Sequence, residues 1–350
     1  MRTEKPIRVV LGAMALRPGG SGVQTYEREL IRALGRCDAP DVDFAATVQS
    51  DAVAELPSRV KAITRPVGSG AKRALFGLLP AGQADVFHSL DVDLPVGQRG
   101  TLVATVHDMS VFDTPWAMSK ARARGEQALL RRSLRAADVL IAVSEFTAKR
   151  VKELTGRVAR VIPLAPASWV RVPGEKEVEA VRAKYALPES FVFQLGTLEP
   201  RKKPDVVAAA AQRLGVPMVL AGAGTDAPNL GFPARGLGYV DREDIPALYR
   251  AATVVCYAST YEGFGLPPLE AMACGAVVVA SDVGGIRDAV GEGAVLVDTL
   301  SFDAWVGALQ GPLFDADQRD HLIRRAGQRV AEMSWDTVAR ETLTVYRDVV

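Results

Sequence analysis

Two carboxylates flank a loop rich in glycine and proline between residues 261 and 275, which reads Y-E-G-F-G-L-P-P-L-E-A-M-A-C-G. The acids are Glu262 and Glu270, and Gly263 and Gly265 lie between them. Glycine has no Cβ, so backbone N–H groups there can turn toward a ligand. Carboxylate oxygens accept hydrogen bonds from hydroxyls, whereas a helix N-terminus favours phosphate. Hydroxyls beside phosphate describe a nucleotide sugar, and this loop predicts a ligand of that class.

A pair of cations forms a second candidate site, in the run E-P-R-K-K-P. Arg201 and Lys202 directly follow an apolar run at residues 191–195 and Gly196. Cations at the carboxyl end of a strand can neutralise a diphosphate leaving group, whose charge grows as the sugar–phosphate bond breaks. Arginine adds planar two-point contacts, and lysine adds a movable point charge. The alternative is a solvated turn, and Lys203 receives no role.

The composition limits the class of protein. A chain of 350 residues exceeds a comfortable single core, so two domains are expected. Its 48% hydrophobic and 24% charged residues are ordinary for a soluble globular protein, and a net charge of +1 argues against a nucleic-acid binder. Three scattered cysteines favour neither a disulfide framework nor a zinc site. We expect a cytoplasmic protein without a signal peptide or membrane span.

Short apolar runs alternate with helical patterns along most of the chain. The runs that predict strands are 7–14, 44–48, 60–63, 86–88, 102–106, 139–143 and 158–162, then 191–195, 218–221, 237–240, 254–257, 277–280 and 295–297. This alternation predicts parallel sheets covered on both faces. The proline-rich segment 163–173 is interpreted as an interdomain linker. Two doubly wound halves predict a ligand cleft between them, at the carboxyl ends of their strands.

The segment from Glu262 to Glu270 resembles the E-x7-E element of retaining GT-B glycosyltransferases, and the chain resembles glycosyltransferase family four. The similarity includes G-T-L-E-P-R-K at 196–202, S-D-V-G-G at 281–285 and, more weakly, T-V-H-D at 105–108. It implies an α/β protein of GT-B architecture, with two Rossmann-like doubly wound parallel-sheet domains facing a central cleft.

The resemblance also implies the extent of each domain. Residues 1–165 would form an N-terminal, acceptor-side domain, completed by a returning C-terminal helix at 337–350. Residues 174–334 would form the nucleotide-sugar-binding domain.

Roles for individual residues follow from the same resemblance. Glu262 would bind the transferred sugar, Glu270 the ribose hydroxyls, and His107 would face the donor sugar. His88 also ends a predicted strand, and a buried structural role is expected for it. The candidate catalytic residues are His107, Arg201, Lys202 and Glu262. The candidate donor-binding residues are Gly20, Ser21, Gly22, Phe264, Gly265, Leu266, Glu270, Gly284 and Gly285.

The predicted function is retaining transfer of a hexose from a nucleoside diphosphate donor to an acceptor hydroxyl, in polysaccharide or glycolipid biosynthesis. Mannose from GDP-mannose is favoured, and a dTDP- or UDP-sugar donor for a rhamnosyl- or glucosyltransferase is the alternative. A sugar-nucleotide epimerase, a retaining phosphorylase and a non-catalytic sugar-nucleotide binder are further alternatives. We expect no cofactor and no metal, because Arg201 and Lys202 would handle the diphosphate. The D-x-D pattern at 91–93 recurs at 41–43 and 315–317 and carries little information.

A basic segment at 120–135 could bring the protein to the inner face of a membrane. Its cations are Lys120, Arg122, Arg124, Arg131, Arg132 and Arg135. Such a helix could meet a phosphorylated, lipid-linked acceptor at a membrane surface. A solvated helix face is the alternative. The expected partners are thus a nucleotide-sugar donor and a saccharide or lipid-linked acceptor, and no nucleic acid.

Overall fold

The computed structural model describes residues 5–350 apart from Gly19, Ser21 and Val92. The donor-binding prediction for Ser21 therefore lies outside the described residues. The chain divides into two compact units, one made of Met1–Leu164 and Ser334–Val350 and the other of Ala165–Met333. Between residues 162 and 174, where the linker is predicted, the chain contains neither helix nor strand.

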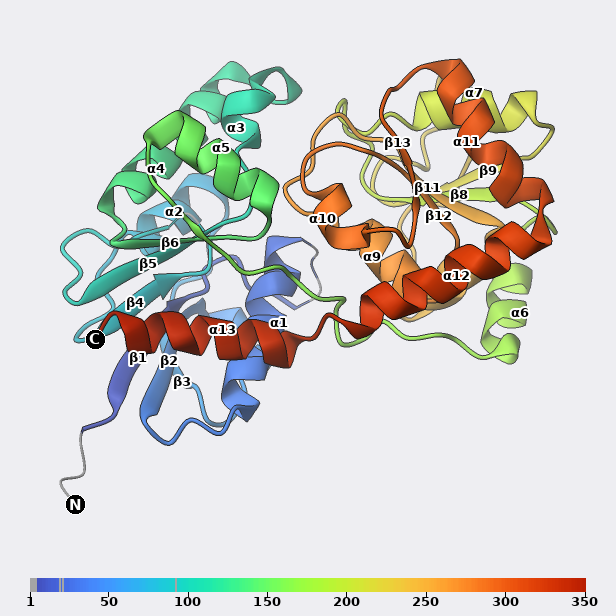
Figure 1. Ribbon diagram of the computed structural model, residues 1–350. Helices are drawn as coiled ribbons and strands as arrows, with labels where there is room; N and C mark the ends of the chain where they lie inside the picture. Colours follow the sequence, from blue (N-terminus) through green and yellow to red (C-terminus); the bar gives the residue numbers. More distant parts are fainter. Residues whose placement is uncertain (1–4, 19, 21, 92) are drawn as a thin grey trace. The chain divides into compact units, whose positions relative to one another are not determined.

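The first unit is built on a parallel sheet of seven strands in the order β3-β2-β1-β4-β5-β6-β7 (Figure 1). Its strands are β1 (Ile7–Gly12), β2 (Val42–Gln49), β3 (Lys61–Arg65), β4 (Val86–Ser89), β5 (Thr101–Val106), β6 (Val139–Ala142) and β7 (Arg160–Val161). Its helices are α1 (Val23–Arg36), η1 (Ser50–Glu55), α2 (Gly70–Gly77), α3 (Ser110–Asp113), η2 (Pro115–Ala117), α4 (Lys120–Ala136), α5 (Glu145–Thr155) and α13 (Trp335–Asp348).

The central strands of this sheet are apolar runs because both of their faces are covered. On one face, Leu130 and Leu134 of α4 and Val151 of α5 join the buried side chains of the strands in one cluster. The runs predicted at 86–88 and 102–106 become β4 and β5, whose buried residues include Phe87 and Val106. Continuous burial of this kind makes the strands predictable from the sequence.

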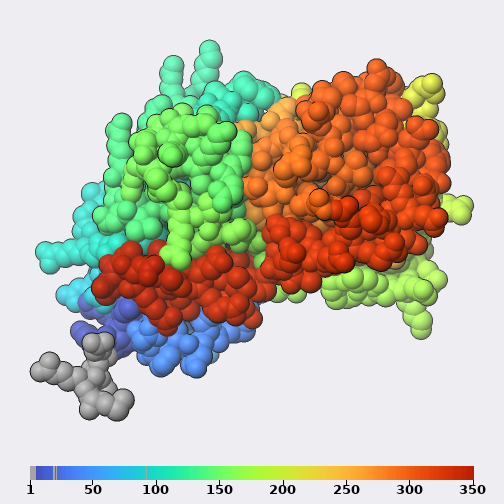
Figure 2. Space-filling view, in the orientation of Figure 1, coloured from blue at the N-terminus to red at the C-terminus, as the bar shows by residue number. Residues whose placement is uncertain are grey.

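The last helix, α13, packs against α1 within the first unit. It begins where the Ser334 hydroxyl accepts a hydrogen bond from the Thr337 N–H at 3.1 Å, a typical N-cap. Its outer side carries Arg347, whose Nε donates to the Asp41 carboxylate at 2.8 Å. Figure 2 shows this side of α13 in dark red, beside the blue N-terminal residues of the first unit. The helix is thus an integral layer of that unit.

The second unit has a parallel sheet of six strands in the order β10-β9-β8-β11-β12-β13. Its strands are β8 (Val192–Leu195), β9 (Met218–Ala221), β10 (Arg235–Gly236), β11 (Val254–Tyr257), β12 (Val278–Ser281) and β13 (Val295–Val297). Its helices are α6 (Glu175–Lys184), α7 (Pro204–Arg213), η3 (Arg242–Asp244), α8 (Ile245–Ala251), α9 (Leu266–Ala273), α10 (Ile286–Val290), α11 (Phe302–Phe314) and α12 (Ala316–Ala331).

One strand lies outside its predicted range. The sequence predicts a strand at 237–240, but β10 is Arg235–Gly236, which pairs with Val219 and Leu220 of β9. The chain turns at Gly238, whose φ is +69° and whose N–H donates to the Thr225 hydroxyl at 3.0 Å. Apolar character alone therefore placed the strand too late, because the turn at Gly238 lies inside the apolar run.

Among the described helices, none is both long and apolar enough to cross a membrane.

Candidate active site

The two candidate loops of the second unit follow neighbouring strands. β8 leads into residues 196–203, and β11 leads into residues 258–265. In the sheet, β9 lies on the far side of β8 and β12 on the far side of β11, so the chain leaves the central pair in opposite directions. Ligands of open α/β sheets bind at such switch points, beyond the carboxyl ends of the strands. The topology places both loops where small-molecule sites form.

Backbone hydrogen bonds hold these loops together. The Thr260 N–H donates to the Arg201 carbonyl at 2.9 Å. Lys202 and Ser259 form an isolated antiparallel bridge. These bonds fix the backbone that carries both cations directly against the backbone that carries the acid, so the side chains are positioned from a rigid base.

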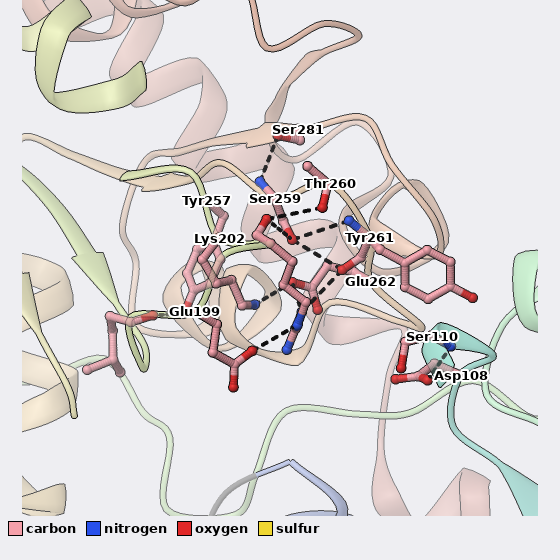
Figure 3. A network of polar contacts seen from close by, with 12 residues as sticks. Asp108, Ser110, Glu199, Lys202, Tyr257, Ser259, Thr260, Tyr261, Glu262 and Ser281 are labelled. Carbon is pink, nitrogen blue, oxygen red and sulfur yellow. Dashed lines mark hydrogen bonds and ion pairs between the residues drawn. The ribbon is translucent and has the colours of Figure 1, made fainter. Parts of the chain in front are cut away.

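Ser259 is a residue that the sequence did not single out. It is fully buried, and its N–H donates to the Ser281 hydroxyl of β12 at 3.0 Å. Its own hydroxyl donates to the Tyr261 carbonyl at 3.1 Å (Figure 3). A small hydroxyl residue in A-S-T-Y-E, directly after a buried strand, is the only sequence signal that could have indicated this role. Ser259 acts by shaping the turn that presents Glu262.

The Glu262 carboxylate receives both cations on one oxygen (Figure 3). The Arg201 Nη1 lies 3.0 Å from Oε1, and the Lys202 Nζ pairs with the same atom. The Arg201 Nε also pairs with Glu199 at 2.9 Å, a contact that the sequence did not predict. The Lys202 ammonium further lies 5.6 Å from the centre of the Tyr257 ring. The site is therefore a compact charged group whose members orient one another.

Charge decides the protonation of Glu262. Burial of the carboxyl would raise its pKa, but the charges of Lys202 and Arg201, with hydrogen bonds from Lys202 and Ser259, lower the pKa below its ordinary value. The lysine and glutamate side chains are only 12% and 14% exposed, so water screens the attraction weakly. Glu262 is thus a carboxylate at neutral pH and acts as a hydrogen-bond acceptor.

Helix α9 begins four residues after Glu262 and carries Glu270. The helix starts after Gly265, whose φ of +111° is a backbone conformation that favours glycine. Leu266 is the first helical residue, and Phe264 is buried. Glu270 is itself buried, with 8% exposure. The second acid therefore belongs to the rigid helix and the first to the loop in front of it.

Gly284 and Gly285 follow β12 and touch the same loop. The Gly285 N–H donates to the Glu262 carbonyl at 2.9 Å. A Cβ on Gly284, whose φ is +60°, would overlap that carbonyl oxygen. Close approach of two backbones therefore requires glycine here, and this gives S-D-V-G-G a packing reason that sequence alone did not reveal. The predicted contact of these glycines with donor phosphates remains a prediction.

His107 belongs to the first unit and directly follows β5. Its Nε2 lies 2.7 Å from the Leu90 carbonyl oxygen, so this nitrogen carries a proton and donates. Its ring meets the Tyr26 ring edge-on, with centroids 4.7 Å apart. Gly20 and Gly22 also belong to this unit, and Gly22 precedes α1 with a φ of +60°. The predicted site residues are thus divided between the units.

Two family models match the chain. Residues 177–329 match the model described as Glycosyl transferases group 1, and residues 20–165 match Glycosyltransferase Family 4. Over 282 residues the chain is 32% identical to O-antigen chain mannosyltransferase B of Escherichia coli, which covers 75% of this chain and 74% of that relative. The chain belongs to glycosyltransferase family 4.

This glycosyltransferase is also similar to a second relative and to a solved structure. It is 30% identical over 295 residues to D-inositol 3-phosphate glycosyltransferase of Nocardiopsis dassonvillei, with 76% of this chain and 68% of that relative covered. The structure of Anabaena HepE in complex with UDP-glucose matches with a TM-score of 0.72 and 21% identity, covering 97% of this chain and 100% of that one. The predicted GT-B fold is confirmed by such neighbours and by the two parallel sheets.

Both acids of the D-x-D pattern at 91–93, in the first unit of this glycosyltransferase, pair with an arginine. The Arg73 Nη1 lies 3.4 Å from Asp91 and 3.6 Å from Asp93. Burial, together with the charge of Asp91, raises the pKa of Asp93 to about 6 despite this arginine. No cluster of three or more His, Cys, Asp or Glu side chains suited to a metal ion occurs in the described part of the chain.

The basic segment forms helix α4, with one side strongly cationic. At 100° per residue, positions 120, 124, 131 and 135 fall within an arc of about 60°. All of these are exposed lysine or arginine residues. The acid of this helix, Glu126, pairs with Arg122 at 2.7 Å, away from that arc. Trp116, in η2 just before the helix, is 56% exposed. This cationic side of α4 is a surface without a neutralising acid of its own helix.

Proposed function

We propose that this glycosyltransferase retains the anomeric configuration of its donor and transfers a hexose, favouring mannose from GDP-mannose, to an acceptor hydroxyl. The observation that supports this most strongly is the pairing of Arg201 and Lys202 on the Glu262 carboxylate. Arginine has five N–H donors and the lysine ammonium three, so each cation can hold Glu262 and a phosphate oxygen at once.

In the proposed reaction, the bond between the sugar C1 and the diphosphate oxygen breaks as C1 bonds to the acceptor oxygen on the same face. The acceptor proton passes to an oxygen of the departing diphosphate. Negative charge on the diphosphate rises during this step, and Arg201 and Lys202 stabilise it. Glu262 accepts hydrogen bonds from the transferred sugar and keeps both cations in place.

The remaining site residues bind the donor in this proposal. Glu270 accepts hydrogen bonds from the ribose hydroxyls, and His107 contacts the transferred sugar. The backbone at Phe264, Gly265 and Leu266 donates to that sugar. Gly20, Ser21, Gly22, Gly284 and Gly285 would bind the donor phosphates. The fixed positions of Glu270 on α9 and of the Glu262 loop support these roles in the second unit.

We also propose that the reaction needs no metal, because cationic side chains balance the diphosphate. Transfer assayed in EDTA should equal transfer in added Mg²⁺ or Mn²⁺. Loss of activity in EDTA that either ion restores would contradict this. Proton NMR of the product made from an α-linked donor tests retention, since an α-linked product is expected and a β-linked product would exclude it.

The choice of mannose is supported by the similarity to O-antigen chain mannosyltransferase B, and GDP is the nucleotide that we propose for its donor. A UDP-sugar is the alternative, because HepE is described with UDP-glucose, and dTDP-rhamnose remains a further option. A thermal-shift panel of GDP, UDP, dTDP and ADP separates these. A nucleotide at a hundredfold excess over its Kd stabilises the folded state by about 2.7 kcal/mol, a shift of a few degrees. A shift with UDP alone would replace mannose by a UDP-linked sugar.

We further propose that the cationic side of α4 contacts an anionic membrane that carries a lipid-linked acceptor. Each cation near such a surface contributes about 1 kcal/mol. Replacing Lys120, Arg124 and Arg135 by serine should therefore weaken sedimentation with vesicles containing phosphatidylglycerol roughly a hundredfold. Arg122→Ser is the matched control, because Glu126 already neutralises that arginine. Equal vesicle binding by the triple variant and the wild type would exclude this surface.

A further inference from the structure

A chain of hydrogen bonds crosses the first unit from its last helix to its first. The Tyr346 hydroxyl of α13 lies 2.6 Å from the His88 Nδ1 of β4. The His88 Nε2 lies 2.8 Å from the Thr105 hydroxyl of β5. That hydroxyl lies 2.9 Å from the Tyr26 hydroxyl of α1. All of these side chains are 2% exposed or less, so the chain excludes water throughout.

Burial determines the protonation state of His88 in this chain of hydrogen bonds. Desolvation, together with the charge of His107, lowers the pKa of His88 to about 3, so His88 is neutral at physiological pH. A neutral imidazole has one donor and one acceptor nitrogen. The Tyr346 hydroxyl can therefore donate to Nδ1 while Nε2 donates to Thr105. The Thr105 oxygen has two lone pairs, so it can also accept from Tyr26. Each of these bonds can form in one consistent arrangement.

The chain ends beside the one site residue of the first unit that is a titratable group. The edge-to-face contact between Tyr26 and His107 restricts the imidazole plane, and the Leu90 carbonyl holds Nε2 in its protonated form. In neutral His107 the lone pair is then on Nδ1, on the side of the ring away from that bond. Tyr26 is also contacted by Trp335, the first residue of α13, at 6.0 Å between ring centres.

We infer that Tyr26 is a positioning residue for His107, and that α13 holds Tyr26 through Trp335 and through the Tyr346–His88–Thr105 hydrogen bonds. The inference rests on the proposed contact of His107 with the donor sugar. Its physical basis is that a catalytic side chain must be fixed closely by its neighbours, since small misplacements cost rate steeply. Helix α13 accordingly helps to orient the donor sugar, because it holds Tyr26 and Tyr26 positions His107.

A double-mutant cycle between Tyr26 and His107 tests this. Tyr26→Phe removes the hydroxyl and Tyr26→Leu also removes the ring edge, so kcat should fall about threefold and about tenfold, with donor KM changed little. Thr105→Val and Tyr346→Phe should resemble Tyr26→Phe. In a His107→Ala background, each change should have no further effect, because residues that act through one group are not additive. Arg347→Gln, on α13 next to Tyr346, should leave kcat unchanged.

The outcomes separate this inference from the proposed function. If His107→Ala transfers sugar as fast as the wild type, both the sugar contact of His107 and its positioning by Tyr26 are wrong. If His107→Ala is slow but Tyr26→Leu costs tenfold in both backgrounds, the positioning role alone is wrong.

A second measurement does not depend on activity. The protein has three histidines, so its imidazole ¹⁵N spectrum contains few signals. We expect a single Nε2–H tautomer for His107 in the wild type, because its Nε2 donates to the Leu90 carbonyl. In Tyr26→Leu the ring edge that restricts the imidazole plane is gone, so the imidazole can turn away from that carbonyl and a tautomer mixture is expected. An unchanged His107 spectrum in that variant would overturn the inference.

Discussion

The two units hold their candidate site residues by different physical means. In the second unit, Glu262 is held by charged partners, and its neighbours Arg201 and Lys202 remain partly exposed at 27% and 12%. In the first unit, His107 is held by a carbonyl and an aromatic edge, behind which lies a buried chain of neutral groups. Cationic side chains can stabilise the negative charge that develops on a leaving group. A buried network of neutral hydrogen-bonding groups instead holds a side chain in one orientation.

This difference predicts which substitutions should lower the rate of sugar transfer most. Removing a charge from the second unit should cost more rate than removing a hydroxyl from the first. Substitutions in each unit therefore test whether charge in the second unit matters more for the rate than neutral contacts in the first.

Replacing Glu262 by glutamine should lower kcat/KM at least about a hundredfold, the scale of losing one preorganised charged contact. The amide is nearly isosteric but cannot balance Lys202 and Arg201. Glu199→Gln is the matched control, because Glu199 pairs with Arg201, lacks an ion pair with Lys202 and is 42% exposed. We expect a loss of only a few-fold for that control in the same steady-state assay. Equal losses would mean that the carboxylate shared by both cations has no special part.

Gly284→Ala should damage the same loop through the backbone. The new Cβ would overlap the Glu262 carbonyl, so the loop must shift, and transfer should fall about tenfold or more. Gly291→Ala is the control: its φ of +54° brings similar local strain, but the nearest atoms are those of the Arg329 side chain. Both variants should lose about 1 kcal/mol of stability from the left-handed conformation. If kcat falls equally in both, loop packing at Gly284 does not govern the site.

A smaller effect, on stability and not on rate, is expected from Asp93 in the first unit. Its pKa of about 6 lies above the unfolded value, so folding favours the protonated acid. The associated stability is present below pH 4 and is lost as the pH rises through 6. Asp93→Asn should therefore raise the free energy of unfolding, measured by urea denaturation, by about 3 kcal/mol at pH 8 and change it little at pH 4.

Asp85→Asn gives the opposite pH dependence and serves as the control. A hydrogen bond from Arg8 lowers the pKa of Asp85, so its stability is present at neutral pH and lost on acidification. That variant should be destabilised at pH 8 and equal to the wild type at low pH. Parallel behaviour of the two variants would show that burial does not control Asp93.

The sequence predicted the strands of both units well, because buried parallel strands are continuous apolar runs. Met218–Ala221 and Val254–Tyr257 match the predicted bounds, and β8 and β12 differ from theirs by about one residue. The strand at 237–240 was wrong because Gly238 turns the chain within an apolar run. Propensity cannot reveal such a turn, since it depends on the hydrogen bond from Gly238 to Thr225.

The residues of the candidate site could be named from the sequence, but their contacts could not. Glu262, Arg201 and Lys202 were all named from the sequence. In the structure, Arg201 and Lys202 both pair with one carboxylate oxygen of Glu262. The bridge between Lys202 and Ser259 depends on β8 and β11 being neighbours, which strand order alone decides. The need for glycine at 284 likewise depends on the approach of two loops that lie far apart in the sequence. Tertiary contacts of this kind leave no local pattern.

In the proposed reaction Lys202 stabilises the departing diphosphate. Sugar transfer is measured for Lys202→Ala beside Lys203→Ala, which removes the adjacent lysine, to which no site role is assigned. We predict that Lys202→Ala lowers kcat at least about a hundredfold while Lys203→Ala transfers sugar at close to the wild-type rate. A fully active Lys202→Ala enzyme would contradict the claim.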